Sequence, residues 1–212
     1  LYNTISNFEI SNSYICRTGH YGFWIKSLGL NMNFDDIKNN NIKILDCLFE
    51  NTGGSGFVPN KSSNVLVENC IFNHSGSSLD PRMWKRGSGM WPFDCYNVIA
   101  QQNYFMNARG PLDSYGSHID YGNENVVFQY NFSINNEGGF IEILGDNINC
   151  GYRYNISVND GYRLDPNNEL WKKRGKTFFV SNYCGSNTVR CPNSGTFIYN
   201  NTSFVNDTLS TE

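Results

Sequence analysis

A short pattern that recurs along the whole chain constrains the fold more than any other feature of this sequence. It consists of an apolar residue, any residue, a second apolar residue, one or two further residues, an Asn or Asp, and a second short apolar segment. The Asn or Asp is found at Asn12, Asp46, Asn69, Asn103, Asn131, Asn155 and Asn201. The apolar runs alternate with period two and show almost no helical periodicity, which indicates short strands. Such self-similarity predicts a repeat architecture.

The spacing of these Asn and Asp residues distinguishes a solenoid from a β-sandwich. Successive positions are 34, 23, 34, 28, 24 and 46 residues apart. The shortest intervals have the length of a bare coil, and the longer ones fit a coil with an inserted loop. A sandwich would not explain an Asn at the same place in each run, whereas in a parallel β-helix it turns a corner and bonds to its equivalent about 4.8 Å away. We therefore predict an all-β fold, a single-stranded right-handed parallel β-helix of about seven coils with inserted loops, forming one domain over residues 1–212.

A third strand is expected after each corner, usually introduced by Gly. Aligning these strands on their glycines predicts a buried column made of Trp24, Val58, Trp91, Ile119, Ile141 and Phe179. The residues before and after each member then point outward. The preceding ones are Phe23, Phe57, Met90, His118, Phe140 and Phe178, and the following ones are Ile25, Pro59, Pro92, Asp120, Glu142 and Val180.

The outward columns contain the strongest candidates for chemistry. His118 and Asp120 are two residues apart on one strand and therefore share a face. The alignment stacks Asp120 on Glu142 of the next coil, and two carboxylates at contact distance would raise one pKa unless a proton or cation lies between them. These residues could share a proton, act as acid and base, or bind a metal such as Ca²⁺. The alternative is a solvated outer face without a function.

The loops beside this strand add further candidates. Arg109 and Asp113 precede it and could reach the same groove, where an Arg can bind a substrate carboxylate; the alternative is an ion pair that braces the loop. Glu137 lies at the matching corner of the next coil, and Asp94 on the preceding coil could extend the acidic row.

Aromatic residues near these loops could serve as platforms for sugar rings. We expect this role for Trp84, which lies on a long insertion, and consider it for Tyr115 and Tyr121. Trp91 falls in the predicted buried column, so a role in the core is favoured for it. The basic run that includes Arg82 and Arg86 is interpreted as a solvated loop.

Composition excludes several classes of function. The net charge is −3, so the chain has no basic excess with which to neutralise nucleic acid. No apolar run approaches the roughly 20 residues of a membrane span. Seven cysteines cannot all pair within one chain; Cys184 and Cys191 flank a loop-like stretch and are the expected disulfide, while most others are expected to be small core residues. The chain begins at Leu1 without a signal peptide, so we expect a processed form or a fragment, with further coils or self-association at its open ends.

The repeated corner Asn, together with the segments 113–127 and 137–145, resembles the right-handed parallel β-helix proteins of the pectate-lyase-like superfamily, and residues 87–161 resemble its bacterial members most closely. The resemblance implies a carbohydrate-active enzyme with a groove on one outer face of the helix. The sequence lacks the Asn-Thr-Asp, Asp-Asp, Gly-His-Gly and Arg-Ile-Lys set of polygalacturonases and the arginine motif of pectate lyases. No catalytic residue is therefore transferred from those enzymes.

Two classes of function follow. The first is an extracellular enzyme that degrades a polysaccharide: as a hydrolase it would use Asp120 and Glu142 as acid and base with His118 beside them, and as a lyase the same carboxylates would hold Ca²⁺ while Arg109 or His118 took part in proton abstraction. The second is a non-catalytic β-helix, such as an adhesin, fibre or tailspike-like protein. In that case Phe23, Phe57, Phe140 and Phe178 would form an exposed stripe that contacts a partner.

Overall fold

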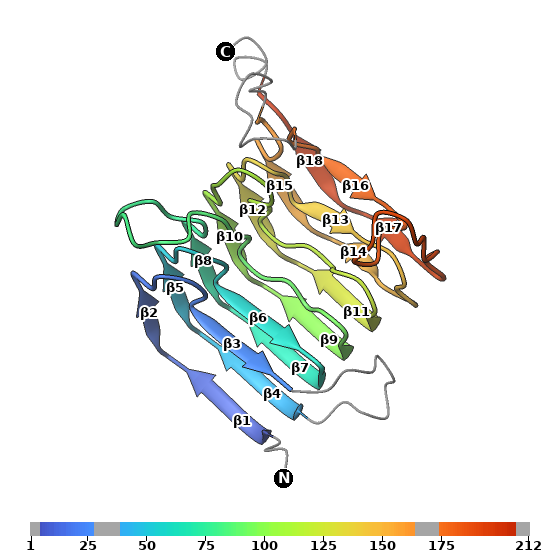
Figure 1. Ribbon diagram of the computed structural model, residues 1–212, viewed down its shortest axis with the longest axis horizontal. Coiled ribbons are helices and arrows are strands. Elements are labelled where there is room, and N and C mark those ends of the chain that lie inside the picture. The colour runs from blue at the N-terminus through green and yellow to red at the C-terminus, as the bar shows by residue number, and fades with distance from the viewer. Residues whose placement is uncertain (1–4, 28–38, 164–173, 207–212) are drawn as a thin grey trace.

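The computed structural model describes residues 5–27, 39–163 and 174–206, which stack as successive coils of a parallel β-helix (Figure 1). Each coil contributes one strand to a first sheet and one to a second sheet. All strand pairs in these two sheets are parallel, and each sheet has seven strands. The β-helix of about seven coils predicted from the repeat is therefore confirmed. The described residues include no helix that is long and apolar enough to cross a membrane.

The first sheet is built from the longer strands. In spatial order these are β1 (Ser6–Ser11), β4 (Asn39–Leu45), β7 (Ser62–Glu68), β9 (Tyr96–Gln101), β11 (Glu124–Gln129), β14 (Gly151–Arg153) and β17 (Phe197–Tyr199). The second sheet contains the strands that follow the corner, namely β2 (Tyr14–Cys16), β5 (Leu48–Glu50), β8 (Ile71–Asn73), β10 (Tyr104–Met106), β12 (Phe132–Ile134), β15 (Ile156–Val158) and β18 (Thr202–Phe204).

A third face closes each coil and is less regular. Its named strands pair as β3 (Phe23–Lys26) with β6 (Phe57–Asn60) and β13 (Ile141–Ile143) with β16 (Phe178–Val180). Between these pairs, the coils are joined by isolated parallel bridges, including Phe57 to Met90, Met90 to Ser117 and Ile119 to Ile143. Loops of different length enter and leave the helix beside this face.

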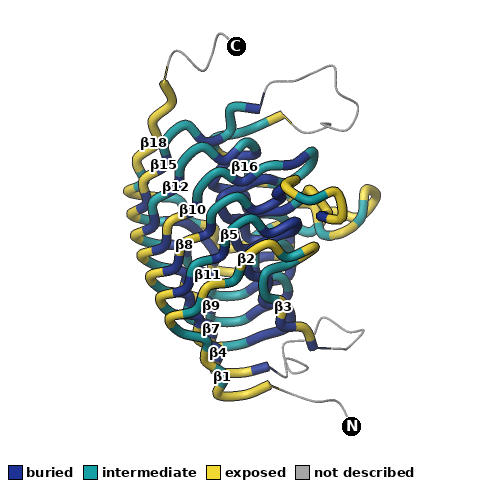
Figure 2. The backbone as a smooth tube through the Cα atoms, turned by 90° about the vertical axis from the view of Figure 1, so that its left-hand side faces the viewer, coloured by how far each residue is buried: buried dark blue, intermediate teal, exposed yellow. Residues whose placement is uncertain are grey.

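Side chains from the three faces fill the interior of the stack, which Figure 2 shows as buried backbone enclosed by partly and fully exposed corners. The rings of Phe49, Phe72 and Phe105 stack on consecutive coils with centroids 4.9 and 5.0 Å apart. The rings of Phe128 and Tyr152 continue the aromatic packing at 5.1 Å. Burying one such side chain stabilises the fold by about 1.5–3 kcal/mol.

The sharp corner between the first and second sheets combines two adjacent positions. The first adopts the left-handed backbone conformation, which Asn and Asp tolerate better than other residues with a side chain. In successive coils it is occupied by Asn12, Asp46, Asn69, Gln102, Tyr130, Tyr154 and Asn200, with φ between 48° and 57°. The second position points inward and forms a ladder of hydrogen bonds.

The ladder is confirmed for the four later coils. The backbone N–H and side-chain amide of Asn103 both donate to Oδ1 of Asn131, at 3.0 and 3.1 Å. Asn131 bonds to Asn155 in the same way at 2.9 and 3.0 Å, and Asn155 bonds to Asn201 at 3.0 and 2.8 Å. Each amide thus satisfies two buried donors from the previous coil, which would be costly to leave unpaired.

The prediction was wrong for the earlier coils. Asn12, Asp46 and Asn69 lie one residue before the ladder, at the left-handed position. The inward position there is taken by Cys47 and Cys70, whose thiols contact backbone carbonyls much as the amides do. Cys70 Sγ lies 3.5 Å from the carbonyl oxygen of Ile44. Asn is favoured at both corner positions for different reasons, so a single alignment merged them.

Candidate functional site

The register of the third face differs from the prediction and determines which side chains meet. The bridges align Met90 with Ser117, and Ile119 with Ile143. Glu142 is paired with Phe179 in the ladder between β13 and β16. His118 therefore stacks on Glu142, and the predicted stacking of Asp120 on Glu142 is wrong by two residues.

The inside and outside of this face were exchanged at Trp24, Val58, Trp91 and Phe179, which were predicted to be buried. The prediction is confirmed for Ile119 and Ile141, which lie in the core, and for His118 and Glu142, which lie on the outer side. The continuous column is Trp24, Val58, Trp91, His118, Glu142 and Phe179, and it points away from the core. Trp24 is 46 % exposed, whereas Phe57, Met90 and Phe140 are fully buried. Because side chains alternate along a strand, an error of one residue reverses both faces. The expected exposed stripe of Phe23, Phe57, Phe140 and Phe178 is accordingly largely an inner wall.

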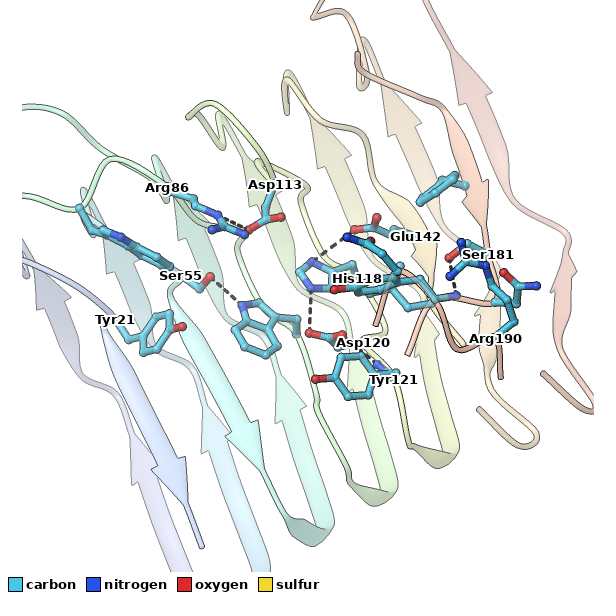
Figure 3. Close-up of a pocket in the computed structure, with 17 residues that line it drawn as sticks. Tyr21, Ser55, Arg86, Asp113, His118, Asp120, Tyr121, Glu142, Ser181 and Arg190 are labelled. Atoms are coloured by element: carbon cyan, nitrogen blue, oxygen red, sulfur yellow. Dashed lines mark hydrogen bonds and ion pairs between the residues drawn. The ribbon is translucent and has the colours of Figure 1, made fainter. Parts of the chain in front are cut away.

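His118 lies between two carboxylates from different parts of the chain (Figure 3). Its Nε2 is 3.9 Å from Oδ2 of Asp120, and its Nδ1 is 3.8 Å from Oε2 of Glu142. Nδ1 also lies 3.1 Å from the hydroxyl of Ser88. The ring is held at both nitrogens and can exchange a proton with either neighbour.

The electrostatic surroundings favour a charged imidazole. Burial alone would lower the pKa of His118, but the nearby carboxylate of Asp120 and the charges on Glu142 and Asp113 outweigh it, so the pKa is raised. The indole of Trp91 stacks on the imidazole with centroids 5.4 Å apart and planes 9° apart. A flat indole face adds attraction for an imidazolium.

A hydrogen-bond network behind the ring fixes this arrangement. The indole N–H of Trp91 donates to the hydroxyl of Ser55 at 2.8 Å, and the backbone N–H of Ser88 donates to the same oxygen at 3.0 Å. The Ser88 hydroxyl in turn accepts the backbone N–H of Tyr115 at 3.2 Å. Trp91 and His118 are thus positioned through two buried serines of the preceding coils.

Asp113 comes from the loop before the His118 strand. Its Oδ2 accepts a hydrogen bond from Nε of Arg86 at 2.8 Å, and this ion pair stabilises the negative charge of the carboxylate. The guanidinium of Arg86 also lies over Trp84, 5.3 Å from the ring centroid. The basic run at 82–86 therefore supplies a functional candidate rather than only a solvated loop.

The backbone around Asp113 is held by a buried arginine from a later coil. Arg163 Nη1 donates to the carbonyl of Gly110 at 2.5 Å and to the hydroxyl of Ser114 at 3.3 Å. Its Nη2 donates to the carbonyls of Leu112 at 3.4 Å and of Asp113 at 3.0 Å. One planar guanidinium therefore ties together the loop that presents Asp113.

The side chains of Asp113, His118, Asp120 and Glu142 line a pocket of about 640 Å³ on the outside of the third face. Its polar lining includes Ser55, Arg86, Asp113, His118, Asp120, Glu142, Ser181, Asn182, Asn187 and Arg190, and its apolar and aromatic lining is Tyr21, Trp84, Trp91, Tyr121, Leu144, Phe179 and Tyr183. A concave site with aromatic walls and a few convergent polar groups is the usual form of a small-molecule site.

Not all sequence candidates reach this pocket. Trp84 and Tyr121 line it, but Tyr115 is fully buried, with its ring edge-on to His118 at 6.1 Å, so it is not an exposed platform. Trp91, assigned to the core, instead forms part of the pocket wall.

Three charged candidates pair outside the pocket. Arg109 lies 3.5 Å from Glu137, so the alternative of a bracing ion pair describes its geometry, although its partner is Glu137 and not Asp113. Asp94 is buried and pairs with Lys61 at 3.6 Å. Burial raises the pKa of both Glu137 and Asp94, against the lowering effect of Arg109 and Lys61 respectively.

The donor set around His118 does not fit calcium. Ca²⁺ takes six to eight oxygen ligands, whereas Asp120 and Glu142 face opposite nitrogens of an imidazole. Within the described ranges, no group of three or more His, Cys, Asp or Glu side chains is arranged to hold a metal ion. Calcium binding stays a prediction, and no chemical step is derived through a metal.

One wall of the pocket is the loop closed by Cys184 and Cys191, and its position at the pocket could not be predicted from the sequence. The predicted disulfide between Cys184 and Cys191 is present, and Tyr183 and Arg190 beside it form an antiparallel bridge. Tyr183, Asn187 and Arg190 line the pocket opposite His118. The cysteine spacing was the only sequence signal for this loop, and it carried no information about the surface that the loop faces.

The match to a protein family agrees with the architecture. The family model described as "right handed beta helix region" matches residues 2–160. A comparison with curated proteins gives no match. Two solved structures of the GH136 lacto-N-biosidase from Eubacterium ramulus are similar: the native protein has 23 % identity and a TM-score of 0.49, covering 82 % of this chain and 27 % of that one. Its selenomethionine derivative has 18 % identity and a TM-score of 0.45, covering 79 % and 29 %. The chain thus spans under a third of their length, and the likeness concerns the fold alone.

Proposed function

We propose that this chain, which belongs to the right-handed β-helix family, carries the active site of a secreted glycoside hydrolase that binds a glycan in the pocket on its third face. The observation that carries the proposal is a pair of carboxylates, Asp113 and Asp120, that open into one aromatic-lined pocket on either side of His118 (Figure 3). Glycosidic bonds are cleaved by two carboxyl groups that flank the scissile bond.

Exposure selects these two from the three carboxylates of the pocket. The side chains of Asp113 and Asp120 are 22 % and 16 % exposed, whereas that of Glu142 is 2 % exposed and lies behind the imidazole. A group that touches substrate must be reachable from the pocket. We therefore retain Asp120 from the pair inferred from sequence, replace its partner by Asp113, and assign Glu142 as a positioning residue that orients His118.

The neighbours of Asp113 and Asp120 suggest a different role for each carboxylate. Arg86 stabilises Asp113 as an anion, which suits a nucleophile or a base that activates water. The imidazolium of His118, 3.9 Å from Asp120, would supply the proton that Asp120 passes to the leaving oxygen, and the neutral imidazole would then take up a proton again. The separation of the two carboxylates in the substrate complex would decide between retention and inversion.

The pocket walls support a sugar as the ligand. Trp84, Trp91 and Tyr121 offer ring faces to the apolar side of a pyranose, and Ser181 and Asn187 offer hydrogen bonds to hydroxyl groups. The disulfide between Cys184 and Cys191 is consistent with an oxidising, extracellular location. A pocket of this size favours a short glycan segment over a long stretch of polymer.

A lyase is the less favoured enzyme. β-Elimination requires a cation that neutralises the uronate carboxylate. Of the two arginines that line the pocket, Arg86 is engaged by Asp113, and Arg190 donates to the carbonyls of Ser186 and Val189 in its own loop. The carboxylates near His118 are arranged to share its protons rather than to surround a calcium ion.

The test is a degradation screen on neutral and acidic oligosaccharides and polysaccharides, with and without EDTA, following both reducing ends and unsaturated products. We expect new reducing ends, no unsaturated product and no effect of EDTA. Asp113→Asn and Asp120→Asn should each lower kcat about 10³-fold, within the range for loss of an acid–base group. Proton NMR of the first product would identify retention or inversion.

Asp46→Asn is the matched control, because Asp46 is exposed at a corner and has the left-handed backbone conformation that Asn tolerates. Its activity should equal that of the unmodified protein. Unsaturated products that disappear with EDTA would replace the hydrolase by a calcium-dependent lyase. Glycan binding without turnover in any arm would favour the non-catalytic β-helix.

A further inference from the structure

A second concave surface lies at the corner between the first and second sheets, across the helix from the pocket on the third face. It is a groove of about 670 Å³, and its walls include the corner residues Tyr130 and Tyr154 and the strand residues Tyr104 and Phe132. These side chains come from three successive coils, because Tyr104 is aligned with Phe132, and Phe132 with Ile156. The groove therefore runs along the helix axis.

The aromatic side chains of this groove are exposed to an unusual degree for a packed domain. Tyr104, Tyr130 and Tyr154 are 50 %, 55 % and 41 % exposed. The rings of Tyr130 and Tyr154 are nearly parallel, with centroids 5.3 Å apart, and those of Tyr104 and Phe132 lie 5.9 Å apart. Contiguous exposed apolar surface of this kind marks a binding site more often than isolated exposed residues do.

Two of the uncharged side-chain amides in the groove are available to a ligand. The side-chain amides of Asn69 and Gln102 continue the corner column beyond Tyr130, and neither makes a hydrogen bond to another residue that the structure describes. None of the residues that line the groove is charged. Aromatic rings beside unengaged amides suit a ligand that has both apolar faces and hydroxyl groups but no charge.

We propose that this groove binds an extended neutral glycan, separately from the pocket on the third face. Successive coils repeat about every 4.8 Å, close to the length of one sugar unit in an extended chain. A glycan along the axis would meet one corner side chain per unit: ring edges and faces at Tyr130 and Tyr154, and amides at Gln102 and Asn69. The proposal does not depend on hydrolysis in the pocket.

The test is native affinity electrophoresis of the Asp120→Asn variant in gels that contain galactan, xyloglucan or glucomannan, with polygalacturonate as the charged comparison. We expect at least one neutral polysaccharide to retard the protein and polygalacturonate not to. The double variant Tyr130→Ala/Tyr154→Ala should weaken this retardation about tenfold, as expected for the loss of two aromatic contacts. Circular dichroism of the double variant would establish that the exposed substitutions leave the fold intact.

Trp84→Ala is the control that separates the two sites, because Trp84 belongs to the pocket on the third face. Any part of the retardation that this variant removes comes from glycan held in that pocket, and the part that remains should still be weakened about tenfold by Tyr130→Ala/Tyr154→Ala. The proposal is overturned if no neutral polysaccharide retards the protein, if Trp84→Ala alone abolishes the retardation, or if the double variant is retarded as strongly as its parent. It is also overturned if gel filtration shows a dimer that the double variant dissociates, since a second copy would then occupy the groove.

Discussion

The first and second sheets differ from the third face in how regularly their coils pair. Each sheet continues through seven strands in a constant register, whereas the described part of the third face has two strand pairs joined by isolated bridges. The corner between the first and second sheets contains the Asn ladder, and the aromatic side chains of the core lie inside this corner. The irregular face carries Trp91, His118 and Glu142 and the loops that surround them. The candidate site therefore lies on a different side of the coils from this ladder.

This separation follows from where loops can enter a solenoid. Insertions at the corner between the first and second sheets would interrupt the ladder, whereas insertions beside the third face leave it intact. The loops that carry Arg86, Asp113 and Arg190 surround the third face and converge on one pocket. Substitutions in the two regions should accordingly produce different effects, and five predictions test this.

The largest effect is expected at Arg163, which joins the two regions. Arg163→Lys retains a charge but loses the planar fork that binds four acceptors of the loop around Asp113. Misplacing a reacting group by about 1 Å can lower a rate about 100-fold. We expect kcat to fall by about that factor with KM nearly unchanged, in steady-state kinetics on the substrate found by the screen.

Arg153→Lys is the matched control, because Arg153 lies on the outer side of the first sheet and bonds to Gln129 and Tyr199. It should leave kcat unaltered. If Arg163→Lys lowered only the melting temperature and not the kcat of the folded enzyme, Arg163 would be structural and not a positioning residue for Asp113.

The next effect concerns the regular side. Asn131→Ala removes an oxygen that accepts two hydrogen bonds from Asn103 and leaves buried donors unpaired. We expect the free energy of unfolding to fall by about 2 kcal/mol in urea titrations. The kcat of the folded protein should not change.

Cys70→Ala tests the same ladder position in the earlier coils. A thiol there makes weaker contacts with backbone carbonyls, so the loss should be about 1 kcal/mol. Equal losses at Asn131 and Cys70 would mean that the two halves of the ladder contribute equally, contrary to the difference in their hydrogen bonding.

The difference between the two regular sheets and the irregular third face explains which features could be predicted from the sequence. Asn103, Asn131, Asn155 and Asn201 repeat because one geometry recurs, so the coils, the corner and the ladder were predictable. On the third face, glycine alignment placed Ile119 beside Trp91, whereas the bridges place His118 there. His118 and Glu142 were both predicted on the outer side but in different columns, and aligning the two coils on these polar residues would have given the observed register.

The pocket itself was less predictable, because its members come from loops of unrelated length. Arg86 meets Asp113 across 27 residues, and Ser55 meets Trp91 across 36. Neither pair belongs to the repeat, so no periodic pattern reports it. His118, Asp120 and Asp113 could be named because they lie on or next to a predicted strand.

A smaller effect concerns pH. The pKa of His118 is raised in the folded state, since its interactions with Asp120 and Glu142 outweigh burial. Protonation therefore stabilises the fold fully below about pH 6.5, the pKa of an unperturbed His, and this contribution is lost as pH rises through the raised pKa. We expect kcat and the free energy of unfolding to decline on the same alkaline limb, with activity about tenfold lower one pH unit above that pKa.

His118→Asn should remove this limb, and measurement of kcat and urea unfolding between pH 5 and pH 9, roughly the range in which a perturbed His titrates, would reveal it. His20→Asn and His74→Asn are controls, because burial lowers the pKa of both residues and places their titration on the acid side. A limb that persists without His118 would assign it to another group.

The smallest effect is expected from the loop closed by the disulfide. Cys184→Ser/Cys191→Ser frees the ends of the loop that presents Tyr183 and Arg190 to the pocket, but leaves Asp113 and Asp120 in place. We expect KM to rise about fivefold, equivalent to about 1 kcal/mol of binding, with kcat unchanged. Dithiothreitol should reproduce the change in the unmodified protein and have no effect on the double variant.

Cys16→Ser is the control, because Cys16 is an exposed free thiol on β2. A fall in kcat at constant KM would instead show that the loop acts on the reacting groups, and that the irregular face is coupled more tightly than its separate loops suggest.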